Sequence, residues 1–190
     1  FFQHYIYVGA AMKRMGGRKY QLWDEEDGFF YDVLRYPDGR FQKFEVRSLV
    51  GLIPLFAIDV VDDTADGVFL NNLDWFLQNR GEIVGQGCFT DRSGPDRLHI
   101  LSIVDRHQLE RVLARLWDPA EFLSDAGLRS LSKWHKERPF VFGGAEVRYE
   151  PAESDVKIKG GNSNWRGPIW FPTAFLLIES LVKYDRAYRS

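Results

Sequence analysis

"GGNSNWRGPIWFP", residues Gly160–Pro172, stands directly before the most apolar segment of the chain. Its thirteen residues include two tryptophans, an arginine, two asparagines, three glycines and two prolines. Pro168 suits the first turn of a helix, because its φ is already close to the helical value and its missing N–H is not needed there. We therefore predict a final helix over residues 170–188 that begins in this motif.

Length and composition limit the classes of protein that the chain can represent. Its 190 residues make one domain or a large piece of one, and 45% hydrophobic residues are enough to build a core. The net charge of −2 gives no electrostatic reason to expect nucleic acid or an anionic membrane as partner. The longest nearly unbroken apolar run, residues 169–178, is too short to span a bilayer.

The single cysteine indicates the cellular location of the protein, and the first residues indicate whether the chain is a fragment. Cys88 has no partner for an internal disulfide or a multi-cysteine metal site, and this fits a reducing, cytoplasmic location. The chain does not begin with methionine, carries no signal peptide, and opens on residues typical of the middle of a helix. We therefore expect residues 1–190 to be an interior fragment of a longer polypeptide.

Hydrophobic spacing predicts the main elements. Further helices are expected over residues 1–15, 69–80 and 105–117, the last with Asp105 as N-cap. Turn signals at 27–28 and 37–39 flank the aromatic run 29–34, which predicts a β-hairpin. Residues 46–60 are apolar on almost every side, as in a fully buried helix. Residues 81–97 are expected to form a loop, 123–139 a short helix or turn, and 140–161 irregular structure with a possible short strand pair.

Amphipathic helices, with one solvent-exposed face, thus alternate with helices that are apolar on all sides. A two-layer helical array produces this pattern. The sequence predicts an all-α fold with an inserted β-hairpin. The triplet Arg-Ser-Leu occurs twice, at residues 47–49 and 129–131, which is too short to count as a repeat. Both copies nevertheless place polar residues at the edge of an apolar segment.

The motif at 160–172 has the chemistry of a sugar site. Trp165 and Trp170 offer flat apolar faces for a pyranose ring, while Asn162, Asn164 and Arg166 donate hydrogen bonds in fixed geometry. Its glycines allow the backbone to approach a ligand closely. A structural turn, with tryptophans in the core and the arginine paired with a carboxylate, is the alternative. Both interpretations remain open at this point.

Other candidate residues carry weaker signals. Glu150, Glu153 and Asp155 precede the motif and could act on a glycosidic oxygen, hold a hydroxyl or pair with the arginine, which is the ordinary role. "WDEEDG", residues 23–28, could bind calcium, but its spacing is not that of a calcium loop and a solvated hairpin turn fits better. The four histidines lack metal-binding spacing, and Cys88 lacks a nucleophile's setting, so no metal or cofactor is expected.

Five segments together resemble bacterial members of glycoside hydrolase family 63, which includes α-glucosidases and resembles mannosylglycerate hydrolases. They are "LWDEEDGFFYDVL", "VRSLVGLIPLFA", "LSDAGLRSLSKWH", "YEPAESD" and "GGNSNWRGPIWFP", in this order along nearly the whole chain. "NWRGPIW" is the most specific of them. The resemblance implies an (α/α)6 toroid, of which residues 1–190 form a part with fewer than six hairpins.

The resemblance also implies an inverting glycosidase acting on α-linked glucosyl or mannosyl substrates, with no cofactor. Such an enzyme needs a general acid and a general base, and both are expected outside residues 1–190, so the isolated chain should be inactive. Within the chain, Glu153 and Asp155 are secondary catalytic candidates. The residues expected to form one wall of the sugar pocket are Trp23, Asp24, Arg47, Asn164, Trp165, Arg166 and Trp170. The expected partners are an oligosaccharide or small glycoside, together with the remaining hairpins of the toroid or a second copy of the chain.

Two alternatives come from other classes of protein. An epimerase or lyase of the same architecture would use histidine or tyrosine as acid and base, but the four histidines lie outside the aromatic motifs. A non-catalytic carbohydrate-binding helical domain would bind oligosaccharide without turnover. The three hypotheses differ in whether sugar is released, rearranged or only bound.

Overall fold

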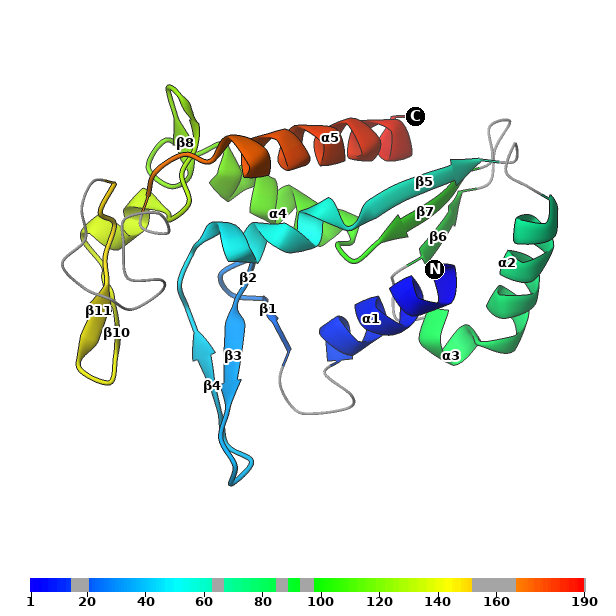
Figure 1. Cartoon of the computed structure of the whole chain (residues 1–190), viewed down its shortest axis with the longest axis horizontal. Coiled ribbons are helices and arrows are strands. Elements are labelled where there is room, and N and C mark those ends of the chain that lie inside the picture. The colour runs from blue at the N-terminus through cyan, green and yellow to red at the C-terminus, as the bar shows by residue number, and fades with distance from the viewer. Residues whose placement is uncertain (15–20, 63–66, 85–88, 93–97, 152–166, 190) are drawn as a thin grey trace. The chain divides into compact units, whose positions relative to one another are not determined.

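The computed structural model describes residues 1–14, 21–62, 67–84, 89–92, 98–151 and 167–189 (Figure 1). This part of the chain mixes helices with short antiparallel strands. It divides into two compact units. Unit 1 comprises Phe1–Gln21, Pro54–Arg106 and Leu177–Ser190, and unit 2 comprises Leu22–Ile53 and His107–Leu176.

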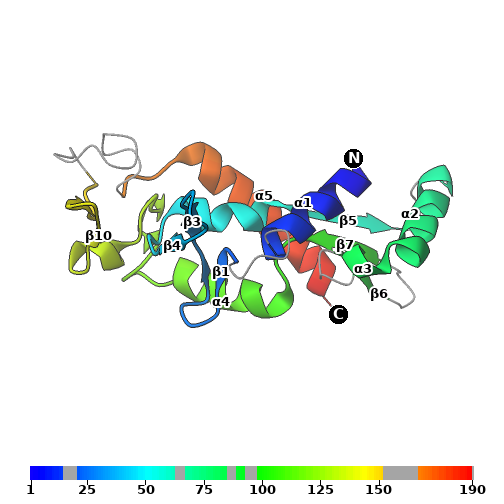
Figure 2. The same ribbon diagram turned by 90° about the horizontal axis from the view of Figure 1, so that it is seen from below.

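Unit 1 is built on a three-stranded antiparallel sheet. Its strands are β5 (Ile58–Asp62), β6 (Phe89–Arg92) and β7 (Leu98–Ser102), with β7 in the centre, and β5 and β7 run side by side in both views (Figures 1 and 2). Helices α1 (Phe2–Arg14), α2 (Gly67–Asn79) and α3 (Gly81–Val84) belong to the same unit.

The core of unit 1 joins helices to this sheet. Ile6 of α1, Phe76 of α2 and Leu101 of β7 are buried together. The ring of Phe2 meets that of Phe76 edge-on, with 5.4 Å between centroids. The spacing of apolar residues along α1 and α2 therefore turns one face of each helix into this core.

Unit 2 consists of four short antiparallel strand pairs beside helical segments. The pairs are β1 (Trp23–Asp24) with β2 (Phe29–Phe30), β3 (Asp32–Arg35) with β4 (Phe41–Phe44), β8 (Leu123–Ser124) with β9 (Gly127–Leu128), and β10 (Phe140–Phe142) with β11 (Ala145–Val147). Its helical segments are α4 (Arg106–Leu116), from His107 on, and the 3-10 helix η3 (Lys133–Lys136). The rings of Phe29 and Phe122 stack in its core at 5.7 Å.

Three of the described elements have residues in both units. They are the 3-10 helix η2 (Leu49–Phe56), the final helix α5 (Phe171–Tyr188) and α4, whose first residue, Arg106, belongs to unit 1. The sequence prediction of α5 is confirmed to within one residue. The helices expected over 1–15, 69–80 and 105–117 are confirmed as α1, α2 and α4, and the expected hairpin is present as β1–β2 and β3–β4.

The prediction of an all-α fold, part of an (α/α)6 toroid, is wrong, because eleven strands lie among the described residues. The main error is at residues 46–60. The expected buried helix is the short 3-10 helix η2 followed by strand β5, and Ile53 is 48% exposed. Pro54 lies inside η2 and cannot donate an α-helical hydrogen bond, while the β-branched residues that follow favour a strand.

The expected loop over residues 81–97 is also wrong in part. Its first residues form α3, and Phe89–Arg92 form β6, which pairs with β7 in the register Phe89↔Leu101 to Arg92↔Leu98. Strand β7 pairs in turn with β5, about forty positions earlier in the chain. No local signal marks the pairing of β5 with β7, but the Gly-Pro dipeptide at residues 94–95, between β6 and β7, is a local turn signal that the loop prediction did not use.

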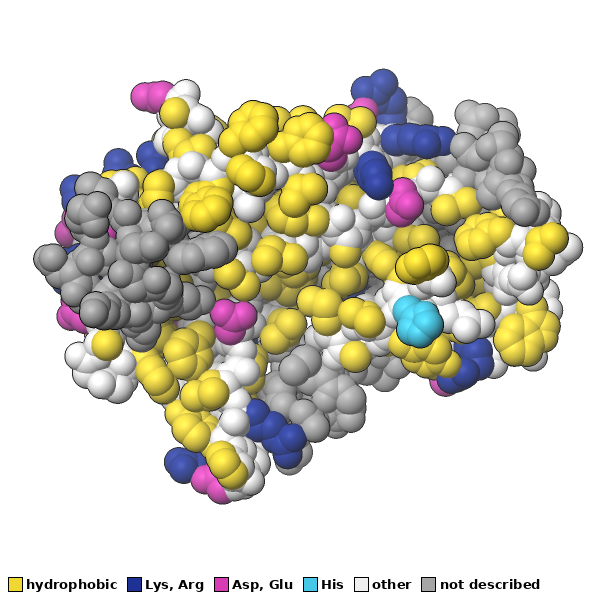
Figure 3. Space-filling view, viewed as in Figure 1, with side chains coloured by type: hydrophobic (Ala, Val, Ile, Leu, Met, Phe, Trp, Pro, Cys, Tyr) yellow, Lys and Arg dark blue, Asp and Glu magenta, His cyan; other side chains and the backbone are white. Residues whose placement is uncertain are grey.

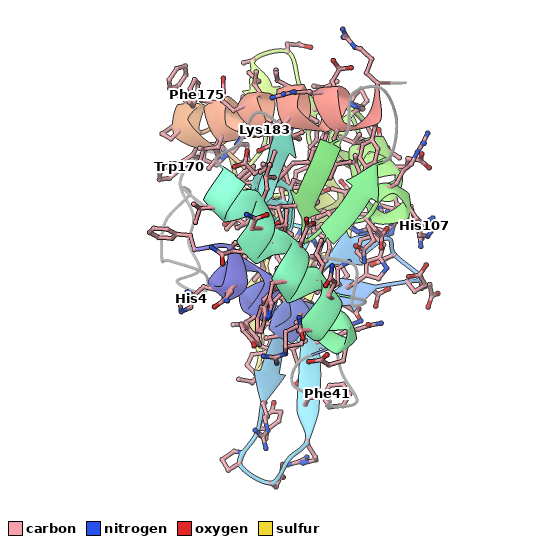
Figure 4. All side chains as sticks on the ribbon, turned by 90° about the vertical axis from the view of Figure 1, so that its right-hand side faces the viewer. His4, Phe41, His107, Trp170, Phe175 and Lys183 are labelled. Atoms are coloured by element: carbon pink, nitrogen blue, oxygen red, sulfur yellow. The ribbon has the colours of Figure 1, made fainter. Side chains whose placement is uncertain are left out.

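Helix α5 has two apolar faces. Leu177, Tyr184 and Ala187 are buried, but large apolar side chains are exposed on the opposite side. These exposed residues, which we call the α5 stripe, are Phe171, Phe175, Ile178 and Val182. Hydrophobic side chains line the upper edge of the molecule over α5, and the Phe175 ring projects away from the helix (Figures 3 and 4). Among the described helices, none has the length and apolar character needed to cross a membrane.

Candidate functional site

The two Arg-Ser-Leu triplets lie side by side in unit 2. Ser48 and Leu131 form an antiparallel bridge. The amide of Leu49 donates to the carbonyl of Ser130, and that of Ser132 donates to the carbonyl of Arg47, each at 2.8 Å. The repetition seen in the sequence therefore marks two segments that pair with each other, although they are 82 positions apart.

The end of the tryptophan motif joins this pair as a third segment. The Ser130 amide donates to the carbonyl of Pro168, and the Gly167 amide donates to the Ser130 hydroxyl, both at 3.0 Å. Arg129 and Ile169 form a second antiparallel bridge. Residues 167–169 are thus held by backbone contacts on the second triplet, immediately before α5 begins.

The guanidinium of Arg47 is enclosed by unit 2. Its Nη1 donates to Glu121 and its Nη2 to Asp27, each at 2.8 Å, while Nε donates to the Tyr31 hydroxyl at 3.3 Å. The flat face of the group lies 4.3 Å from the centre of the Trp134 ring. Only 7% of the Arg47 side chain is exposed, and its guanidinium nitrogens donate hydrogen bonds to groups of this protein.

Glu121 connects three segments through one buried carboxylate. It accepts from Arg47 at 2.8 Å, from Arg115 of α4 at 2.5 Å and from the Ser132 hydroxyl at 2.6 Å. Arg115 also lies 3.6 Å from the Asp27 carboxylate. Two arginines therefore face two carboxylates, and the cluster of Asp27, Arg47, Arg115 and Glu121 is balanced in charge. Removing one member of such a buried set leaves an uncompensated charge, at a cost of about 3–5 kcal/mol.

Asp27 stays ionised in this setting. Burial alone would raise its pKa, but the hydrogen bond from Tyr31 and the charges of Arg47 and Arg115 outweigh burial and lower the pKa below its usual value. Burial and the neighbouring Asp27 carboxylate raise the pKa of Tyr31 in turn. At neutral pH, Asp27 is an acceptor and Tyr31 a donor, so neither group is suited to give a proton to a leaving oxygen.

His135 ties the first triplet to η3. Its Nε2 accepts from the Arg47 amide at 2.9 Å, and its Nδ1 lies 2.9 Å from the carbonyl of Arg138. Because one ring nitrogen must accept while the other donates, these contacts fit the neutral ring with its proton on Nδ1. Burial lowers the pKa of His135, and the charge of Arg47 acts in the same direction.

Arg129, the arginine of the second triplet, binds mainly to backbone carbonyls. Its guanidinium donates to the carbonyls of Pro119, Glu121 and Leu123, and to the hydroxyl of Tyr149. The Tyr149 ring lies against Gly167, whose φ is +141°. A Cβ at Gly167 would overlap this ring, so the motif needs glycine at this position.

The structure places four of the seven predicted sugar-site residues. The Trp23 ring is buried against Phe30 at 4.8 Å, and its indole N–H donates to Glu25. Asp24 accepts from the Asp27 amide at 2.8 Å and from Lys43 at 2.5 Å. Burial alone would raise the pKa of Asp24, but these contacts outweigh it and lower the pKa. These contacts place both residues in the framework of the first hairpin.

Arg47 and Trp170 are brought to the same region by the paired triplets. Trp170 follows the anchored segment 167–169 directly, is half-buried, and its carbonyl accepts from the Ala174 amide at 3.1 Å. Asn164, Trp165 and Arg166 lie outside the described residues, as do Glu153 and Asp155. The turn expected at residues 23–28 is present, but Asp24 and Asp27 are paired with basic side chains rather than solvated.

Sequence reasoning gave no role to Glu121, Arg115, Ser132 or His135, which complete the cluster. Glu121 comes four residues after the predicted end of a helix, in a stretch with no motif. The usable signal was the repeated triplet, since two equal segments at the edges of apolar runs are candidates for pairing. Among the described residues, no group of three or more His, Cys, Asp or Glu side chains is arranged to hold a metal ion.

Comparison with known proteins gives one informative match. Protein YMR196W of Saccharomyces cerevisiae, described as uncharacterized, is 40% identical over 209 residues. The match covers 100% of this chain and 19% of the yeast protein, so the chain spans about a fifth of the length of this relative. No family model and no solved structure matches the chain.

Proposed function

We propose that the chain is part of an inverting glycoside hydrolase acting on α-linked glucosyl or mannosyl substrates, and that it contributes one wall of the sugar pocket. The observation that carries the proposal is the anchoring of residues 167–169 on the paired triplets. These residues connect "NWR", residues 164–166, to Trp170. The side chains of 164–166 and Trp170 are the groups in this motif best suited to contact a sugar.

Anchoring matters because sugar recognition depends on fixed geometry. Hydroxyl groups are also solvated well by water, so a protein gains selectivity only when its donors and apolar faces are held in place before binding. Residues 167–169 are fixed by one backbone bridge, between Arg129 and Ile169, and by the hydrogen bonds that join Ser130 to Gly167 and Pro168, and they supply a fixed base of this kind. Trp165, Arg166 and Asn164 are proposed to contact the substrate from this base, with Trp170 beside them.

Within this proposal, Arg47, Trp23 and Asp24 support the wall rather than touch the sugar. Arg47 is engaged by Glu121, Asp27 and Tyr31, and the Trp23 ring is buried. Neither offers the open donor or ring face that a sugar requires.

The catalytic carboxyls are assigned to no described residue. Inversion requires an acid and a base about 6.5–9.5 Å apart, with room for a water between them and the sugar. Asp27 and Glu121 each face two arginines instead of an open space. Glu153 and Asp155 remain secondary candidates, and the isolated chain is proposed to be inactive.

The test uses the full-length natural protein and proton NMR of the anomeric signals. A set of α-linked glucosides and mannosides is added at substrate concentration, and the first sugar released is observed before it mutarotates. Early appearance of the β-anomer supports the proposal. Early release of the α-anomer contradicts inversion, and tight binding without release favours the non-catalytic carbohydrate-binding alternative.

A further inference from the structure

The buried cluster and the anchored motif are linked through Ser130–Ser132. The Ser132 hydroxyl donates to Glu121 at 2.6 Å and accepts from the Trp134 amide at 3.1 Å. Two residues earlier, the Ser130 hydroxyl accepts from the Gly167 amide. Ser130 and Ser132 are both buried, at 2% and 0% exposure, so these hydroxyl contacts do not compete with water.

Glu121 is the group on which these contacts converge. The amide of Lys133 donates to the Glu121 carbonyl at 3.0 Å, and the carbonyl also accepts from Arg129 at 3.3 Å. Its carboxylate meanwhile holds Arg47 of the first triplet, Arg115 of α4, and Ser132, which directly follows the second triplet. Both the main chain and the side chain of Glu121 therefore hold the segment that receives Gly167.

We propose that Glu121 is a positioning residue for the motif: through Ser132 and Arg47 it holds the paired triplets in register, and through Ser130 it fixes residues 167–169 and the start of α5 at Trp170. Its effect on sugar binding rests on the proposed function. Its effect on the position of residues 167–169 does not, because every contact in the chain of hydrogen bonds belongs to this protein.

The first experiment compares Glu121→Gln with Glu146→Gln by hydrogen exchange of backbone amides. Glu146 is the matched control, since it is a half-exposed carboxylate of unit 2 that pairs with Arg148. We expect Glu121→Gln to speed exchange about tenfold or more at the amides of Leu49, Ser130, Ser132 and Gly167. The paired amides of the β3–β4 hairpin should change about twofold or less.

Two results of this experiment would overturn the proposal. One is unchanged exchange at Gly167 and Ser130 in a folded Glu121→Gln protein. The other is an equal acceleration throughout unit 2, which indicates a general loss of stability. If Glu121→Gln does not fold, Ser132→Ala removes one hydrogen bond to the same carboxylate and is judged by the same amides and the same criterion.

A second experiment measures glycoside affinity in the full-length protein, for variants that are folded at the assay temperature. We expect the Kd to rise about tenfold in Glu121→Gln and to stay within about twofold in Glu146→Gln. Leu73→Ala, a core change in unit 1, controls for destabilisation alone and should leave the Kd unchanged. A normal Kd in Glu121→Gln overturns the positioning role in binding. A wild-type protein that binds no glycoside contradicts the proposed function, while hydrogen exchange still decides the role of Glu121.

Discussion

Gly167 and Gly39 both have a positive φ, at +141° and +87°, but their surroundings differ. A Cβ at Gly39 would meet no atom within 4 Å, whereas one at Gly167 would overlap the Tyr149 ring. We expect Gly39→Ala to lower the free energy of unfolding by about 1–2 kcal/mol, from backbone strain alone. Gly167→Ala introduces similar backbone strain and also the overlap with the Tyr149 ring, so it should lower the free energy of unfolding by about 2–4 kcal/mol. Urea unfolding of both variants measures the difference, and equal losses would contradict the packing of Tyr149 on Gly167.

His135 makes stability depend on pH. Burial lowers its pKa in the folded state, so the unfolded chain binds more protons and the free energy of unfolding falls as pH falls. The loss should begin as pH drops through about 6.5, the ordinary pKa of histidine, with a slope of at most about 1.4 kcal/mol per pH unit.

The measurement is the free energy of unfolding between pH 7.5 and pH 5 for the wild type and two variants. His135→Gln should reduce the slope in this range, because its amide does not titrate. His107→Gln, at an exposed position on α4, is the matched control. A slope that His135→Gln leaves unchanged would show that another group causes the loss.

At the scale of one element, α5 offers neighbouring residues on opposite faces. Leu177 is 3% exposed and Ile178 is 59% exposed. Leu177→Ala should lower the free energy of unfolding by about 2–4 kcal/mol, since it leaves a cavity in the core. Ile178→Ala should change it by about 0.5 kcal/mol or less. Thermal or urea unfolding tests the pair, and a larger loss in Ile178→Ala would mean that the faces of α5 are reversed.

Elements with a local signal could be predicted from the sequence. The helices α1, α2, α4 and α5 show apolar spacing within one segment, and the hairpins at residues 23–44 show their turn residues. The segment of η2 and β5 could not be predicted by hydrophobicity, because a buried helix and a buried strand are equally apolar. Pro54 was the available clue against an α-helix.

The residues of the candidate site also fall into those that the sequence could identify and those that it could not. Its unusual residues, Arg47 among them, could be recognised from the two equal triplets and the tryptophan motif. Their partners could not, because Arg47 meets Glu121 across 74 positions and His135 across 88. The repeated triplet hints that the two segments pair, but no pattern in the sequence indicates which distant side chains then meet Arg47.

At the scale of the whole molecule, the α5 stripe predicts association of the isolated chain. Phe171, Phe175, Ile178 and Val182 form a contiguous apolar row, and rows of this kind favour contact with another apolar surface. Sedimentation velocity should show concentration-dependent association at about 10–100 μM, reduced in a Phe175→Lys, Ile178→Lys variant. Asp125→Lys, which adds the same charge at an exposed position outside α5, provides the control. A chain that stays monomeric over this range would contradict the prediction.

The role of the tryptophan motif as one wall of a sugar pocket is best tested by a single affinity. Isothermal titration of the full-length natural protein with a glycoside that it binds gives the Kd for the wild type and for Trp165→Ala. If the Trp165 ring stacks on the sugar, the variant should bind about tenfold more weakly, a loss of about 1.4 kcal/mol. A folded Trp165→Ala protein with unchanged affinity would contradict the sugar-binding role of the motif.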